Sequence, residues 1–190
     1  MMVKQLKILG ALAVLIALFL MSGCATETKG SVDDQKAAKS DTETVQSEKA
    51  EIDNPTQKLK VKVYFSNQDA TKVVAEEREV LAEDKYTAVV QELINGTSQE
   101  HLVSLIPKST ILKSVTVSNG IAYVDFDDSI VRKFNGGSGA EIILVASIVN
   151  TLTEFSEIDK VQLLLNGASM ETIAGHLDTS KPFARMQEVL

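Results

Sequence analysis

From residue 58 onward, apolar and polar positions follow patterns that predict strands and helices. Strict alternation over residues 58–65 predicts a half-buried strand, whose inward face is formed by Leu59, Val61, Val63 and Phe65. Extended structure is expected to continue over residues 71–81, after a turn. Apolar residues at helical spacing over residues 83–96 predict an amphipathic helix that ends at Asn95-Gly96.

The strongest patterns lie between residues 111 and 155. Two strands are expected over 111–117 and 121–126, because Asn119-Gly120 between them suits a two-residue turn with positive φ at both positions. Ser138 and Glu141 have the spacing of a capping box, which predicts that a long helix starts there. Its apolar stripe is wider than a surface helix needs. We therefore expect the most buried helix of the domain, with no reactive side chain on its apolar face.

The remaining segments complete an α+β arrangement. Residues 99–106 are expected to form a short helical turn, and the nearly continuous apolar run at 160–165 predicts a core strand covered on both faces. The tail from residue 168 to 190 has a mixed pattern, with an extended or helical piece at its end. The predicted fold has two helices on one face of a small mixed or antiparallel β-sheet, with a parallel crossover to the last strand.

The first 24 residues have the pattern of an export signal. Two lysines precede an apolar run over residues 8–21, which is shorter than the about 20 residues that a membrane span needs. The run ends in Leu20-Met21-Ser22-Gly23-Cys24, which resembles the lipobox of a bacterial lipoprotein, with Met21 where Leu is usual. The resemblance implies cleavage between Gly23 and Cys24 and acylation of the Cys24 sulfur. The alternative is an uncleaved anchor with an incidental cysteine.

Residues 25–57 have the composition of a flexible tether. They are rich in Thr, Ser, Lys, Asp and Glu, and their large apolar side chains are limited to Val32, Val45 and Ile52. The sequence therefore predicts a signal peptide over 1–23, a lipidated cysteine and tether over 24–57, and a folded domain over 58–190. The lipid anchor would hold the domain at the extracytoplasmic face of the cell membrane.

Composition narrows the range of partners and cofactors. The formal net charge is -7 and the chain shows no basic stripe, which argues against nucleic acid as a partner. The single cysteine excludes an internal disulfide. Asp125, Asp127 and Asp128 could hold calcium, but they lack the glycine and distal glutamate of an EF-hand. We therefore expect no metal and no cofactor.

The sequence also lacks a strong catalytic motif. His101 and His176 are the only histidines, and either could serve Ser66 or Ser169, but the chain has no Gly-x-Ser-x-Gly elbow. The glycine-rich stretch 135–139 could cradle an anion at a helix start, although it lacks the lysine of a P-loop. We expect no catalytic residues.

A family resemblance covers most of the predicted domain. It rests on Val63-Tyr64-Phe65, Glu77-Arg78, Leu93, Gly96, Ile106-Pro107, Ser114-Val115, Asn119-Gly120, Ala122, Val124-Asp125, the run from Ile148 to Phe155, Val161 and Gly167. These positions resemble the GerMN domain of sporulation and spore-germination proteins and of bacterial surface lipoproteins. The resemblance implies a compact domain similar to ring-building motifs, without catalytic activity.

Five residues in this pattern are candidates for an interaction or structural motif: Glu77, Arg78, Asn150, Thr153 and Glu154. For Glu77 and Arg78 we expect a partly buried salt bridge that fixes the register of the second strand.

The sequence thus favours a lipid-anchored binding or scaffolding module of the cell envelope, with a link to sporulation or germination. Its expected partner is an envelope protein or a cell-wall polymer. Two alternatives remain open: a cell-wall hydrolase or enzyme accessory that uses Ser and His, and a subunit that self-associates into a ring.

Overall fold

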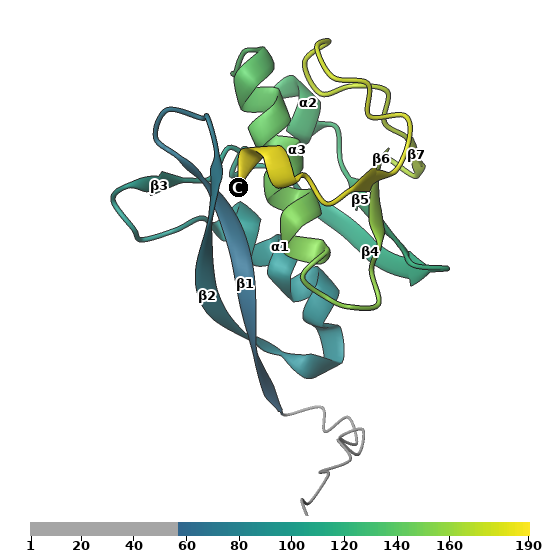
Figure 1. Ribbon diagram of the computed structural model, residues 1–190. Coiled ribbons are helices and arrows are strands. Elements are labelled where there is room, and N and C mark those ends of the chain that lie inside the picture. Colours follow the sequence, from purple (N-terminus) through teal and green to yellow (C-terminus); the bar gives the residue numbers. More distant parts are fainter. Residues whose placement is uncertain (1–56) are drawn as a thin grey trace, which may run out of the picture. The chain divides into compact units, whose positions relative to one another are not determined.

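The computed structural model describes residues 57–190; the predicted signal peptide, Cys24 and nearly all of the tether lie outside them. The first sheet has the order β2-β1-β3 and consists of β1 (Lys58–Asn67), β2 (Val73–Leu81) and β3 (Leu102–Val103). The second sheet consists of β4 (Leu112–Ser118), β5 (Ile121–Phe126), β6 (Lys160–Leu165), β7 (Ala168–Ser169) and β8 (Phe183–Ala184). The helices are α1 (Lys85–Asn95), α2 (Ser129–Arg132) and α3 (Ser138–Leu152) (Figure 1).

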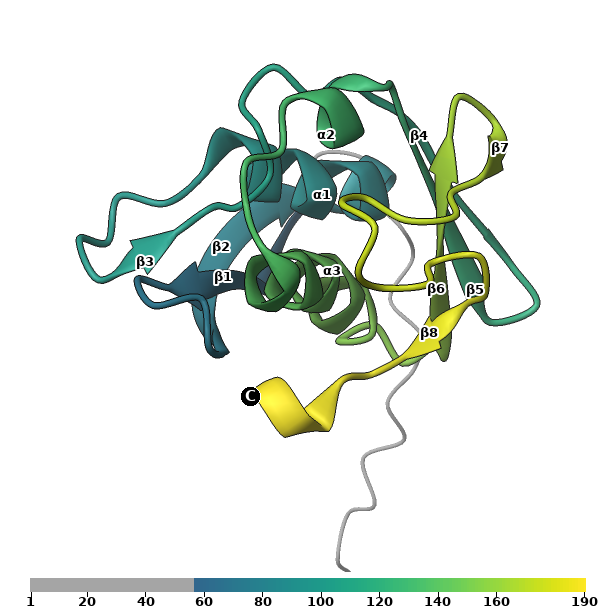
Figure 2. The same ribbon diagram turned by 90° about the horizontal axis from the view of Figure 1, so that it is seen from above.

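The two long helices lie between the two sheets. Figure 2 shows β1 and β2 on one side of α1 and α3, and β4, β5 and β6 on the other. Every residue of α3 from Ile143 to Leu152 is buried as a result. A helix that is apolar on all sides needs such an environment, so α3 forms the centre of the domain's core.

The strand pairings follow from the turn chemistry and the chain order. β1 and β2 pair antiparallel along nearly their whole length, from Lys58 opposite Leu81 to Ser66 opposite Val73. The predicted hairpin is confirmed, since β4 and β5 pair across Asn119 and Gly120, whose φ angles are 52° and 74°. β5 then pairs with β6 in parallel, as predicted for a connection through a long helix.

The α+β class is confirmed, but the number of sheets differs from the expectation. A single sheet was expected, because alternation along a strand does not indicate which other strand it pairs with. Residues 102 and 103 form the short strand β3 where a helical turn was expected. They pair with Ser66 and Asn67, a long-range contact that has no local signal in the sequence.

The start of α3 also differs from the expectation. The helix begins at Ser138 as predicted, yet its N-cap is Gly137 and no side chain caps it. Glu141 is completely buried and accepts hydrogen bonds from the loop after β7 instead of from the helix start. The predicted capping box is therefore wrong, and Glu141 holds a loop in place of capping the helix.

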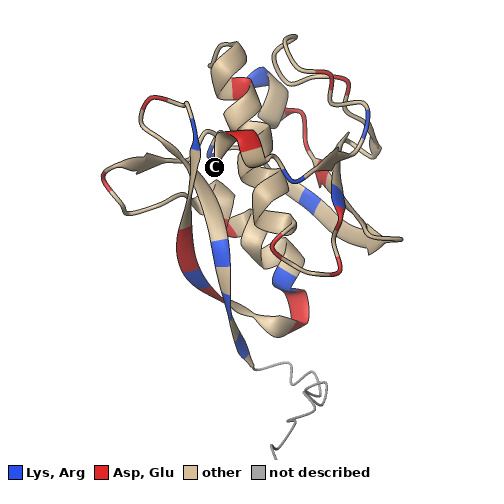
Figure 3. Ribbon diagram, viewed as in Figure 1, with Lys and Arg blue, Asp and Glu red and all other residues tan. Residues whose placement is uncertain are grey.

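Charged side chains lie on the exposed face of the first sheet. Lys60 and Lys62 alternate with apolar residues along β1, and Glu77 and Glu79 occupy the matching positions of β2 (Figure 3). Lys58 contacts Glu79 at 3.5 Å across the two strands.

Candidate functional site

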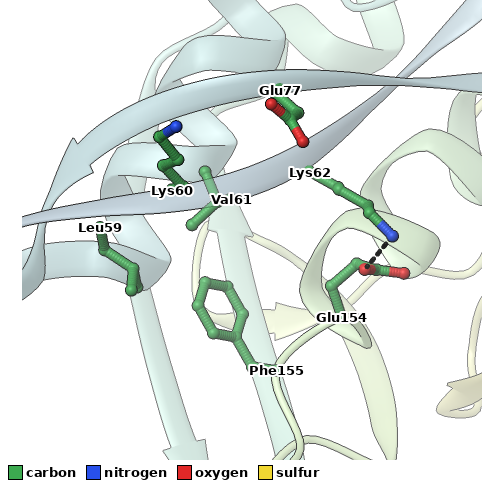
Figure 4. Close-up of a pocket in the computed structure, with 7 residues that line it drawn as sticks. All are labelled: Leu59, Lys60, Val61, Lys62, Glu77, Glu154 and Phe155. Carbon is green, nitrogen blue, oxygen red and sulfur yellow. Dashed lines mark ion pairs between the residues drawn. The ribbon is translucent and has the colours of Figure 1, made fainter.

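A groove of about 280 Å³ runs along β1 at the side where the strand faces the end of α3. Four consecutive residues of β1 line it, from Leu59 to Lys62, together with Glu77, Glu154 and Phe155 (Figure 4). Leu59, Val61 and Phe155 are apolar and only partly buried. The charged groups of the other residues surround this apolar surface, which gives the groove an apolar floor and a polar rim.

The groove lies at an edge of β1 that, within residues 57–190, has no neighbouring strand for most of its length. On one side β1 pairs with β2 throughout, whereas on the other side β3 pairs with Ser66 and Asn67 alone among the described residues. The main-chain N–H of Tyr64 points to this second side, because it donates to the Thr151 hydroxyl at 2.9 Å. Alternate residues of a strand direct their N–H and C=O groups to the same edge. Lys60 and Lys62 therefore present their main-chain groups to the groove.

Glu154 connects the rim to a partly buried polar network. Its carboxylate lies 3.7 Å from the Lys62 ammonium on the groove side. On the other side it accepts a hydrogen bond of 2.8 Å from the Tyr64 hydroxyl and pairs with Arg185 at 2.5 Å. The Arg185 guanidinium also lies over the Tyr64 ring, 5.2 Å from its centre. This network fixes Glu154 in place at the end of the groove.

This network shifts the pKa values of Glu154 and Tyr64. Burial alone would raise the pKa of Glu154, but the hydrogen bonds from Tyr64 and Arg185 outweigh burial and lower it below its ordinary value. Burial and the neighbouring Glu154 carboxylate raise the pKa of Tyr64. Glu154 is therefore an anion and Tyr64 a neutral hydrogen-bond donor at neutral pH.

Asn150 and Thr153 bind the C-terminal segment. The Asn150 side chain donates to the main-chain carbonyl of Met186 at 3.0 Å and accepts from its N–H at 2.8 Å, as a neighbouring strand would. Arg185 donates to the Thr153 hydroxyl at 3.3 Å. Asn150, Thr153 and Glu154 thus act together as a clamp on residues 185 and 186.

The floor of the groove is held by contacts with α1. The Phe155 ring meets the Tyr86 ring edge to face, with 5.1 Å between their centres. Lys85 lies over both rings and pairs with Glu157 at 2.8 Å. Burial would raise the pKa of Glu157, but hydrogen bonds from Lys85 and Tyr86 lower it to about 2.

Glu77 and Arg78 do not act as a pair. Neighbouring residues of a strand point to opposite faces, so Glu77 lies beside the groove while Arg78 faces α1. Arg78 does form a partly buried salt bridge, with Glu76 at 2.9 Å and with Glu92 of α1 at 3.1 Å. It therefore ties β2 to α1, and the partners of this salt bridge are Glu76 and Glu92 where Glu77 was expected.

The other predicted candidates are used within the fold. Asp125 accepts the N–H of Gly167, Asp127 accepts the N–H of Ile111, and Asp128 pairs with Arg132. Within residues 57–190 no group of three His, Cys, Asp or Glu side chains has the arrangement of a metal site. His101 and His176 are exposed, and no hydrogen bond of the described residues joins either ring to a serine. Gly23 and Cys24 lie outside the described residues.

Sequence reasoning missed two important residues, Glu141 and Arg185. Glu141 binds Thr172 and the main-chain N–H groups of residues 173, 174 and 176. Its one sequence signal is an acid inside a run of apolar helix residues. Arg185 lies in a tail of mixed pattern, so nothing local indicated that it reaches Glu154.

A comparison with known protein families identifies the family of this chain. Residues 62–171, more than half of the chain, match the model of a family described as "Germane: Sporulation and spore germination". The chain belongs to the Germane family, which confirms the GerMN resemblance. The search of curated proteins found no match.

Solved structures show the same fold. A structure named "Putative Lipoprotein from Clostridium perfringens" is 26% identical, with 67% of this chain and 87% of that chain covered and a TM-score of 0.50. The tandem GerMN domains of the sporulation protein GerM from Bacillus subtilis are 26% identical, with 75% and 50% covered and a TM-score of 0.55. The first of these domains alone is 24% identical, with 67% and 98% covered and a TM-score of 0.58.

These matches concern the folded domain. The chain spans half of the tandem structure, as expected for one copy of the domain. No helix among residues 57–190 is both long enough and apolar enough to cross a membrane.

Proposed function

We propose that this protein is a lipid-anchored binding module of the bacterial envelope. Its single GerMN domain docks on another envelope protein and performs no catalysis, and Cys24 carries the anchor. The family's description as sporulation and spore germination supports a role in those processes. The similar Clostridium perfringens protein named as a lipoprotein supports the anchor.

The groove at the open edge of β1 is the observation that carries this proposal. It combines main-chain groups that no strand of residues 57–190 pairs, a partly exposed apolar floor and a charged rim, which are the features of a protein-docking surface. Its titratable groups are Lys60, Lys62, Glu77 and Glu154, of which Lys62 and Glu154 pair with each other. No serine or histidine of the described residues lines the groove, which is why we assign it to binding and not to hydrolysis.

The anchor is tested by fractionating cells that produce the full-length protein or its Cys24→Ser variant. We expect the wild-type protein in the membrane fraction, with the mass of a chain that begins at an acylated Cys24. The Cys24→Ser variant cannot be acylated at this position and should keep the mass of the uncleaved chain. A wild-type protein with the uncleaved mass would contradict acylation and indicate an uncleaved anchor.

Binding is tested by crosslinking the lipidated protein in its own membrane, followed by mass spectrometry. The expected result is one dominant envelope protein, absent from cells that do not produce this protein. Capture of the protein alone would instead indicate self-association. Purified full-length protein is also assayed on peptidoglycan, esters and amides, and hydrolysis that is lost in His101→Ala or His176→Ala would overturn the proposal in favour of a hydrolase.

A further inference from the structure

We propose that the open edge of β1 binds an extended, acidic peptide segment of the partner protein, which adds to the first sheet as a further strand next to β1. This inference rests on the proposed function and specifies the chemistry of the docking partner. It follows from the main-chain geometry of β1, the side chains on each side of it, and the local charge.

The main chain of β1 provides the first argument. Lys60 and Lys62 direct their N–H and C=O groups into the groove, and no main-chain bond of the described residues satisfies them on that side. Near Tyr64 the same edge is closed, because the Thr151 hydroxyl accepts the N–H there. The open stretch from residue 59 to 62 corresponds to about 13 Å of strand, enough for a peptide of about four residues.

The side chains define what such a peptide must carry. In a paired strand, residues directly opposite each other point to the same face of the sheet. A peptide residue opposite Val61 would therefore enter the apolar floor beside Leu59 and Phe155. Its two neighbours would lie next to Lys60 and Lys62 on the exposed face. The matching pattern is an apolar residue with an acidic residue on each side.

Charge supports an acidic partner over a basic one. The protein as a whole has a net charge of -7, yet β1 carries Lys58, Lys60 and Lys62 (Figure 3). The carboxylates of Glu77 and Glu79 lie opposite Lys62 and Lys60 on β2, on the side of β1 away from the open edge. Lys60 has no carboxylate within ion-pair distance among residues 57–190. The contact between Lys62 and Glu154 is long at 3.7 Å, and the Lys62 side chain is 55% exposed. An incoming carboxylate can therefore compete for both ammonium groups.

The test uses the full-length lipidated protein in neutral detergent and a short synthetic peptide in which valine alternates with glutamate. Binding is followed by fluorescence anisotropy of the labelled peptide. We expect saturable binding that weakens as salt is added, because the lysines are exposed. A peptide with lysine in place of glutamate should bind at least about tenfold more weakly, since each lost charge pair becomes a repulsion. Equal binding of the two peptides would overturn the acidic character.

Two substitutions at one position separate charge from main-chain pairing. Lys60→Ala removes the ammonium and keeps the N–H group, whereas Lys60→Pro removes both. Proline is tolerated where the N–H does not point at a neighbouring strand, so the pairing with β2 should survive. Lys60→Ala should weaken binding severalfold, and Lys60→Pro by about a further tenfold through the lost hydrogen bond. Equal affinities of these two variants would refute strand addition.

Control variants distinguish a loss of peptide binding from a loss of folding. Lys113→Ala removes an exposed lysine of β4 in the other sheet and should leave peptide binding unchanged. Urea denaturation of the Lys60→Pro variant checks that the fold is intact. A photo-crosslinker placed at residue 60 should capture the envelope partner in membranes, and one at residue 113 should not. Capture from residue 113 alone would refute this inference while the proposed function stands; capture from neither would count against both.

Discussion

The buried carboxylate of Glu141 gives the sharpest test of the energetics of this fold. Its first oxygen accepts the Thr172 hydroxyl at 2.8 Å and the N–H groups of Ile173 and Ala174 at 2.9 Å each. Its second oxygen accepts the N–H of His176 at 3.0 Å. The carboxylate thus binds the loop between β7 and β8 to the start of α3, and substituting it should release that loop.

The cost of each substitution follows from these bonds. Glu141→Ala removes the acceptor of four donors, of which the Ile173 N–H is buried and the other three are partly accessible to water. One fully unsatisfied donor and three weakened ones should lower the free energy of unfolding by about 4 kcal/mol. Glu141→Gln keeps one oxygen, but it loses the charge and turns an amide N–H toward His176. That variant should lose about 2 kcal/mol.

The stabilisation of the fold by the Glu141 carboxylate should also depend on pH. Burial would raise the pKa of Glu141, but the hydrogen bonds from residues 172–176 outweigh burial and lower it from 4.5. A carboxylate whose pKa is lowered by folding stabilises the protein fully above its unfolded pKa and ceases to do so as the pH falls through the folded value. The stability difference between wild type and Glu141→Gln should therefore be largest at neutral pH and shrink below pH 4.5.

Urea denaturation followed by circular dichroism, repeated over a range of pH, measures this difference. Glu171→Gln is the matched control, because that side chain is exposed in the same loop and should change stability by less than about 0.5 kcal/mol. A Glu141→Gln variant as stable as wild type would refute the reasoning. So would a difference that stays constant down to the lowest pH at which the protein folds.

Three further perturbations test other contacts. Asn150→Ala removes both hydrogen bonds to the C-terminal segment and should lower the free energy of unfolding by about 2 kcal/mol in urea denaturation. Gly120→Ala places a Cβ 2.5 Å from a carboxylate oxygen at a φ of 74° and should cost about 2 kcal/mol, whereas Gly139→Ala at the start of α3 should be neutral or slightly stabilising. Lys85→Ala should raise the pKa of Glu157 from about 2 toward 4.5 in an NMR titration.

Each of these three predictions would be contradicted by a specific outcome. Wild-type stability of Asn150→Ala would mean that the tail is held by other contacts. Equal effects at residues 120 and 139 would show that the turn conformation does not limit stability. An unchanged pKa in Lys85→Ala would assign the low value of Glu157 to its hydrogen bond with Tyr86 instead.

The strands and helices could be predicted from the sequence wherever one periodicity is repeated over several residues. The alternation along β1, the Asn119-Gly120 turn and the apolar run of α3 each identified their element. The division into two sheets could not be predicted, because pairing partners are set by long-range packing that leaves the local pattern unchanged. The same limit explains why β3 was expected to be helical.

The candidate site could be predicted only in part. The run around Asn150 and Glu154 drew attention through its family resemblance, but its role as a clamp depends on Arg185 and Met186, more than thirty residues later in the chain. The groove depends on which edge of β1 lacks a neighbour, and a strand's own sequence does not contain that information. Exposed lysines that alternate with apolar residues are equally typical of an ordinary solvated strand, so this pattern does not indicate a binding edge.

The clamp on the C-terminal segment also bears on when the domain can fold. Met186 is 8% exposed and belongs to the core, and its main chain is held by Asn150. During synthesis, β1 and α3 emerge before the residues that complete their packing. A nascent chain that has not yet reached residue 186 therefore lacks part of the native core, so the domain can complete its packing only when this segment is available.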